Sequence, residues 1–127
     1  MPFVRFTEVG RSHTPRVSIS QSGLIGLSKG ARTRFSVDNS THCVLYYDDQ
    51  AKRIGIELTN DSAAEGAQKI RLGRTGVDVS GRSFLSFFGI EVNETTLYPI
   101  CRDADTGYLI IDLSKGRPRG KGQAKGL

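Results

Sequence analysis

The chain contains few of the residues from which metal sites, disulfide frameworks and membrane spans are built. Its 127 residues include two cysteines, Cys43 and Cys101, and two histidines, His13 and His42, with no CxxC pair. This set does not match the ligand spacing of a zinc site, so no metal and no other cofactor is expected. A disulfide would require the strands that carry the two cysteines to adjoin, and buried free thiols are the favoured interpretation.

Long apolar segments are also absent. No apolar run approaches the roughly 18 residues that a membrane-spanning helix needs. The opening segment MPFVRFTEVGR lacks the apolar core of a secretion signal. We therefore expect a soluble, cytoplasmic protein without a membrane partner. Catalysis is not expected, because neither histidine lies in a recognisable nucleophile motif and the segment GLIGLSKG does not have the spacing of a phosphate loop.

Positive charge is concentrated at the end of the chain. The net charge is +5, and the segment 115–127 alone carries five basic residues and no acidic one. The other thirteen basic residues balance the thirteen acidic ones. Because this segment is also rich in glycine and has almost nothing to bury, it is predicted to be a disordered tail that can be held by a polyanion. Its basic residues are Lys115, Arg117, Arg119, Lys121 and Lys125.

The rest of the sequence consists of two halves with a similar order of predicted elements. Half one covers about residues 16–58, half two covers about 69–113, and the polar stretch 59–68 links them. Each half has a short alternating strand, a glycine-containing turn, a second strand, a short helix and a closing hairpin. A duplicated small unit is typical of a module that cannot bury its apolar face alone. We therefore predict one duplicated, mainly β domain with small α content over residues 1–114.

Alternating apolar residues predict the strands, and serines predict the helix starts. Ser28 is expected to cap a helix over 29–36, and Ser80 to cap one over 81–88. The second helix is far more apolar than the first, and a core explains two or three of its large side chains; one exposed phenylalanine would instead indicate a protein interface. These side chains are Phe84, Leu85, Phe87 and Phe88. The strands are expected at 16–20, 24–27, 42–48, 53–58, 77–79, 96–101 and 107–113.

The order of these elements resembles the AbrB/MazE/MraZ group of swapped-hairpin barrels. In half one the matching segments are SGLIGLSKGARTRFSV, VLYYD and RIGIEL; in half two they are TGVDVSGRSFLSFFGI and TGYLIIDL. Two halves in one chain are most similar to the duplicated MraZ arrangement. The resemblance implies a pseudo-two-fold swapped-hairpin barrel built from two ββαββ halves. It also implies a DNA-binding regulator or antitoxin that presents cations from its turns and helices.

The resemblance and the charge pattern together give a set of expected contacts to nucleic acid. Carried over to this chain, the basic turn and helix positions of the group are Lys29, Arg32, Arg34, Arg74 and Arg82. Arg71 belongs to the same basic cluster, and the cations of the tail are expected to add affinity that does not depend on base sequence. We expect these residues to share one face of the molecule.

The function expected from these observations is non-enzymatic nucleic-acid binding, with DNA as the favoured target and RNA as the other. An alternative belongs to a different class: an assembly subunit of a phage or ribonucleoprotein complex, or an inhibitor that docks on another protein's nucleic-acid site. In that case a protein partner would contact the barrel. The sequence leaves open whether the protein is a monomer or a homo-oligomer.

Overall fold

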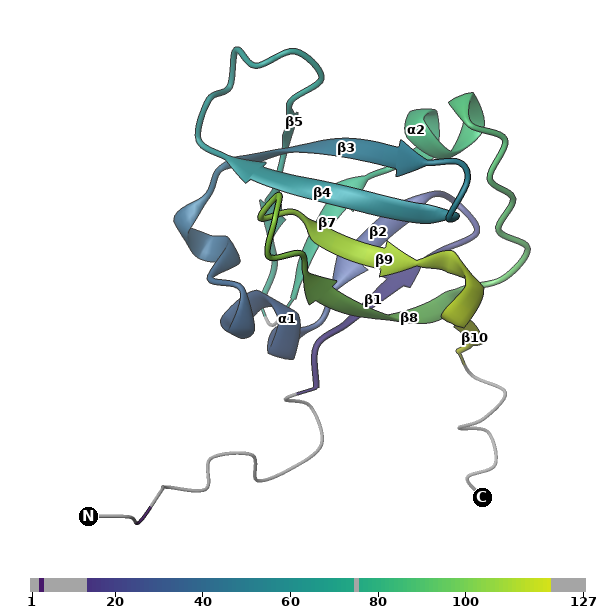
Figure 1. The fold of residues 1–127 in the computed structure, drawn as a ribbon, viewed down its shortest axis with the longest axis horizontal. Coiled ribbons are helices and arrows are strands. Elements are labelled where there is room, and N and C mark those ends of the chain that lie inside the picture. The colour runs from purple at the N-terminus through teal and green to yellow at the C-terminus, as the bar shows by residue number, and fades with distance from the viewer. Residues whose placement is uncertain (1–2, 4–13, 75, 120–127) are drawn as a thin grey trace.

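A computed structural model describes residue 3 and residues 14–74 and 76–119 of the chain. Within them the protein is mainly β with short helices, as predicted (Figure 1). The strands are β1 (Arg16–Ile19), β2 (Leu24–Leu27), β3 (His42–Asp48), β4 (Arg53–Thr59), β5 (Gln68–Lys69), β6 (Arg71–Leu72), β7 (Val77–Ser80), β8 (Thr96–Arg102), β9 (Leu109–Asp112) and β10 (Arg117–Pro118). The helices are α1 (Lys29–Arg34) and α2 (Arg82–Phe87), with 3₁₀ turns η1 (Val37–Asn39) and η2 (Leu113–Lys115).

The strands form one antiparallel sheet that nearly closes into a barrel. Their order is β5-β3-β4-β9-β8-β1-β2-β7-β6, with β10 beside β8. The strands at the two ends of this order, β5 and β6, are separated by Ile70 alone. Because β5 pairs with β3 while β6 pairs with β7, one short stretch of chain joins the two ends of the sheet. This arrangement leaves few unpaired strand edges.

Around the barrel, pairs of neighbouring strands from one half of the chain alternate with pairs from the other. Half one contributes the β1–β2 and β3–β4 hairpins. Four pairings join half one to half two: β1 with β8, β2 with β7, β3 with β5, and β4 with β9. Each half therefore completes its sheet with strands from the other, which explains why a half of this size does not need a core of its own.

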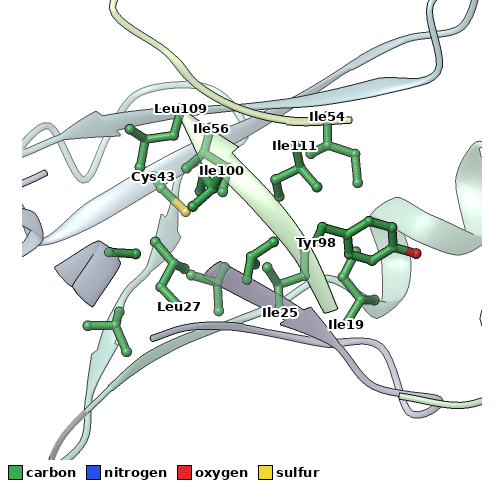
Figure 2. Packing of buried hydrophobic residues seen from close by; sticks show 14 of the residues in the cluster. Ile19, Ile25, Leu27, Cys43, Ile54, Ile56, Tyr98, Ile100, Leu109 and Ile111 are labelled. Atoms are coloured by element: carbon green, nitrogen blue, oxygen red, sulfur yellow. The ribbon is translucent and has the colours of Figure 1, made fainter. Parts of the chain in front are cut away.

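Branched aliphatic side chains fill the barrel interior. Ile54 lies opposite Ile111, and Ile56 lies opposite Leu109, in the β4–β9 ladder. All four are at most 1% exposed. In Figure 2 their side chains point across the interior toward residues of β1 and β2, including Ile25. Because side chains alternate between the two faces of a strand, the residues between these core positions face outward, and one of them, Gly55, is buried beneath Tyr46 and Tyr108.

The helix ends are set by single residues. Ser28 caps α1 as predicted, because its hydroxyl accepts a hydrogen bond from the backbone N–H of Ala31. The helix ends at Arg34 and not at residue 36, since Ser36 adopts a left-handed conformation with φ of 51°. The prediction that Ser80 caps α2 is wrong. Gly81 occupies the cap position, where a Cβ atom would lie 2.5 Å from the Ile25 side chain.

The expectation of a structureless tail from residue 115 is wrong for residues 115–119. Arg117 and Pro118 form β10, which pairs with Leu97 and Thr96 of β8. Gly116 allows this approach, because a Cβ atom there would lie 2.8 Å from the Thr96 methyl group and still closer to the Tyr98 ring. The remaining tail, with Lys121 and Lys125, lies outside the described residues.

The two cysteines are free thiols in different surroundings. Cys43 is buried and Cys101 is exposed, so the expectation of buried free thiols holds for Cys43 alone. Burial raises the pKa of the Cys43 thiol to about 11, and this thiol is therefore protonated at neutral pH.

In the described part of the chain, no helix has the length and apolar character that crossing a bilayer requires.

Candidate functional site

An open groove crosses the outer face of β1, β2 and β7 and is bounded by β10 on one side. It encloses about 710 Å³ and is called the basic groove below. The floor of the groove lies close to the sheet backbone, because two small residues, Ser18 and Gly26, lie opposite each other there in the β1–β2 ladder. A Cβ atom on Gly26 would lie 3.0 Å from the Ser18 hydroxyl, so even alanine would crowd this floor. The groove therefore lets an extended ligand approach the sheet backbone closely.

Five cations line the basic groove: Arg16, Lys29, Arg74, Arg117 and Arg119. Within the described residues, none of the five forms an ion pair with a carboxylate. The one acidic residue in the lining, Asp78, is already paired with Arg71 at 2.7 Å. A concave surface with excess charge of one sign raises the local concentration of ligands of the opposite sign. The geometry therefore suits a polyanion.

Distant parts of the chain bring these cations together. Arg16 begins β1, and its backbone N–H donates to the Ser28 hydroxyl while its carbonyl accepts from the Ser28 N–H. This contact holds Lys29, at the start of α1, beside Arg16. On the other side, Arg117 lies opposite Leu97 of β8, and the Arg119 N–H donates to the Thr95 carbonyl. Strand β8 pairs with both β1 and β10, so it fixes the width of the groove.

Arg32 holds the turn that carries Arg74. Its guanidinium donates to both carboxylate oxygens of Asp38, at 2.7 and 3.1 Å. It also donates to the carbonyls of Gly73 and Gly76, at 2.9 and 3.3 Å, on either side of the β6–β7 turn. All three of its nitrogens are therefore engaged within the fold. The sequence placed Arg32 among the phosphate contacts, whereas the structure gives it the role of tying α1 and η1 to this turn.

The Arg32–Asp38 pair is sensitive to acid. The hydrogen bond from Arg32 lowers the pKa of the Asp38 carboxyl below its ordinary value. A carboxyl whose pKa is lower in the folded state stabilises the protein above its unfolded pKa of about 4. That contribution is lost as the pH falls through the lowered pKa of the folded state. At neutral pH the pair is fully charged.

Replacing Arg32 by lysine is expected to lower the melting temperature by about 5 °C at pH 7. Lysine keeps the charge but cannot bind two carboxylate oxygens and two carbonyls in one plane. Circular dichroism melting curves measure this effect. Arg34→Lys is the matched control, because Arg34 is exposed on the same helix and should melt like the wild type. Equal melting temperatures for the two variants would contradict the structural role given to Arg32.

The other expected contacts lie at several places. Lys29, Arg74, Arg117 and Arg119 do line the basic groove, whereas Arg34, Arg71, Arg82 and Lys115 do not. Arg71 is engaged by Asp78, and Arg82 lines a separate hollow of about 370 Å³ beside the β1–β2 turn. Arg16 lines the groove but was not among the contacts expected from the sequence. The sequence did contain a signal for this position. Arg16 and Ser18 are two residues apart on β1, so their side chains lie on the same, outward face of the strand.

Comparisons with known proteins give no further guide to this site. No family model matches the chain, and no curated protein and no solved structure matches it either.

Proposed function

We propose that this protein is a non-enzymatic nucleic-acid-binding protein whose basic groove contacts the phosphate backbone. The observation that carries the proposal is the gathering of five cations without a described carboxylate partner around a low floor of Ser18 and Gly26. Contacts of this kind position a nucleic acid without reading its sequence. A DNA-binding regulator or an antitoxin-like protein is the biological role that the resemblance to the AbrB/MazE/MraZ group suggests.

We further propose that the barrel has the pseudo-two-fold, swapped-hairpin arrangement of that group. The β2–β7 ladder supports this proposal. If Ile25 corresponds to Val77 and Leu27 corresponds to Val79, a two-fold axis between the strands would pair Ile25 with Val79 and Leu27 with Val77. These are the pairs present in the ladder. The interleaving of strands from the two halves also fits a design in which hairpins are exchanged between two modules.

A second candidate function rests on Phe87. This side chain is 81% exposed on α2, and an exposed aromatic ring is a common feature of protein interfaces. The protein would then be an assembly subunit, or an inhibitor that docks on another protein's nucleic-acid site. In that case the barrel would contact protein, and any affinity for nucleic acid would come from the basic tail alone.

A salt series separates these two functions. Binding to duplex DNA, single-stranded DNA and RNA is measured for the full chain and for a chain that ends after Arg119. The cut is made there because Arg117 and Arg119 belong to the groove. We expect the shortened chain to keep its binding. On duplex DNA, the logarithm of its affinity should fall linearly with the logarithm of the salt concentration, with a slope of about −0.9 per phosphate contact. If removing residues 120–127 abolished all binding, the groove would not be the site.

A further inference from the structure

The outer face of α2 combines a cation, two small hydroxyl side chains and an aromatic ring. At 3.6 residues per turn, Arg82, Ser83, Ser86 and Phe87 lie on the side of α2 opposite the buried Leu85 and Phe84, and Arg82 and Ser86 border the hollow beside the β1–β2 turn. All four side chains are exposed. The two serines lie between Arg82 and Phe87 on this face, so a planar ligand could approach the helix closely between the charge and the ring.

The inner side of α2 packs on the barrel, and one of its rings contacts Phe87. Leu85 is buried, and Phe84 and Phe88 pack against Tyr47 of β3 with ring centroids 6.4 and 5.1 Å away. Phe87 contacts Phe88 nearly at a right angle, at a centroid distance of 4.9 Å. The core therefore accounts for Leu85 and for the partly buried rings, but it does not account for Phe87. A ring that is 81% exposed and contacts Phe88 edge-on presents its open face to a ligand for stacking.

The edge of this face that carries Arg82 and Ser86 adjoins the β1–β2 turn, at the end of the basic groove. The backbone N–H of Gly81 donates to the Gly23 carbonyl at 2.9 Å, which places the start of α2 against the β1–β2 turn (Figure 1). The next residue along that turn, Leu24, lines the basic groove. The hollow of about 370 Å³ beside the turn is lined by Gly23 on one side and by Arg82 and Ser86 on the other. A strand that left the groove over Leu24 would meet α2 next.

We propose that the outer face of α2 binds an unpaired base of a single-stranded nucleic acid, with Phe87 stacking on the base and Arg82 contacting a phosphate. The inference rests on the proposed function of the basic groove and adds the class of nucleic acid that the protein prefers. A base inside a duplex is already stacked on both faces, so Phe87 gains nothing from duplex DNA. Aromatic stacking together with a basic track is the usual way in which proteins bind single strands.

A second copy of the chain is a poorer occupant for this face. Stable protein interfaces bury about 800 Å² on each partner. Among the described side chains of α2 and its C-terminal cap residue, only Phe87 and, in part, Phe88 are exposed large apolar groups, at 81% and 42%. Their neighbours on the outer face, Arg82, Ser83 and Ser86, are polar. Such a mixed surface fits a nucleotide better than it fits the apolar centre of an interface.

The test compares Phe87 variants on single-stranded oligothymidylate and on duplex DNA of the same length. Phe87→Ala is expected to weaken binding to the single strand about tenfold and to leave duplex binding unchanged. Phe87→Leu should show the same loss, because it keeps an apolar side chain but removes the ring, whereas Phe87→Tyr should bind like the wild type. Leu72→Ala is the control, since Leu72 is 52% exposed on β6 and does not line the groove.

A second readout does not depend on affinity. The chain has no tryptophan, so Phe87→Trp introduces a single indole whose fluorescence reports its own surroundings. Oligothymidylate is expected to quench this fluorescence by stacking, while duplex DNA leaves it unchanged. Leu72→Trp serves as the control, and its emission should not respond to either probe.

The possible failures are distinguishable. Unchanged single-strand binding in Phe87→Ala, or full binding in Phe87→Leu, would overturn the stacking role while the groove remained the binding site. A change in sedimentation from oligomer to monomer in Phe87→Ala would assign the face to a second copy and would also overturn it. If neither Phe87 variants nor groove variants affected binding, the proposed function itself would fail.

Discussion

Replacing Arg16, Lys29 and Arg74 together by glutamine is expected to weaken nucleic-acid binding about 100-fold near 0.1 M salt. Each of these cations lines the basic groove and has no carboxylate partner among the described residues. A contact between unit charges about 4 Å apart in water contributes about 1 kcal/mol, so the loss of three contacts amounts to about 3 kcal/mol. The slope of log affinity against log salt should fall by about 2.7, since each phosphate contact on duplex DNA contributes about 0.9.

A second triple variant controls for net charge. Arg34, Lys69 and Lys115 are exposed cations that do not line the groove, and changing them to glutamine removes the same total charge. Fluorescence anisotropy with labelled DNA measures both variants, and circular dichroism verifies that both remain folded. If the two triple variants lost affinity equally, the attraction would come from overall charge and not from the groove.

Replacing Gly23 by alanine is expected to lower the free energy of unfolding by about 3 kcal/mol. Gly23 has a φ of +93°, where an L-residue with a Cβ atom is strained by about 1–2 kcal/mol. The new Cβ atom would also lie 2.7 Å from the Cα atom of Arg82, and backbone atoms cannot move aside as a flexible side chain can. Overpacking of this kind costs about 1–3 kcal/mol. Urea unfolding followed by circular dichroism measures the change.

Gly107→Ala separates the two contributions. Gly107 also has a positive φ, of +79°, but a Cβ atom there would meet nothing within 4 Å. This variant should therefore show the conformational strain alone, about 1–2 kcal/mol. The difference between the two variants reports the contact between the β1–β2 turn and α2. Equal destabilisation would mean that this turn relaxes freely and does not hold α2 in place.

The secondary structure was largely predictable because it depends on local alternation. The strand expected at 42–48 is β3, His42–Asp48, without a change of boundary, since its alternating residues and the turn around Asp48–Gln50 are local signals. The hydroxyl of Ser28 also acts as expected, because a cap involves only the next three residues. Ser80 misled the prediction because the cap position of α2 is decided by contact with Ile25, which lies more than fifty residues earlier.

The candidate site was less predictable, because the sequence gives the positions of the cations but not which of them are already bound to carboxylates or carbonyls within the fold. Arg32 looks like any basic helix residue, yet its partners include the carbonyls of Gly73 and Gly76, more than forty residues away. Arg117 was assigned to a tail, but it joins the groove through pairing with Leu97 of β8. No local pattern encodes either contact.

The alternating strands and the surplus of positive charge follow from the amino-acid sequence alone, since periodicity and composition are properties of the chain. The folded arrangement was needed to show which groove cations have no carboxylate partner among the described residues, that Phe87 is exposed on α2, and that β10 forms one wall of the groove. The physical reason is that these features depend on strand pairings and hydrogen bonds between residues far apart in the chain.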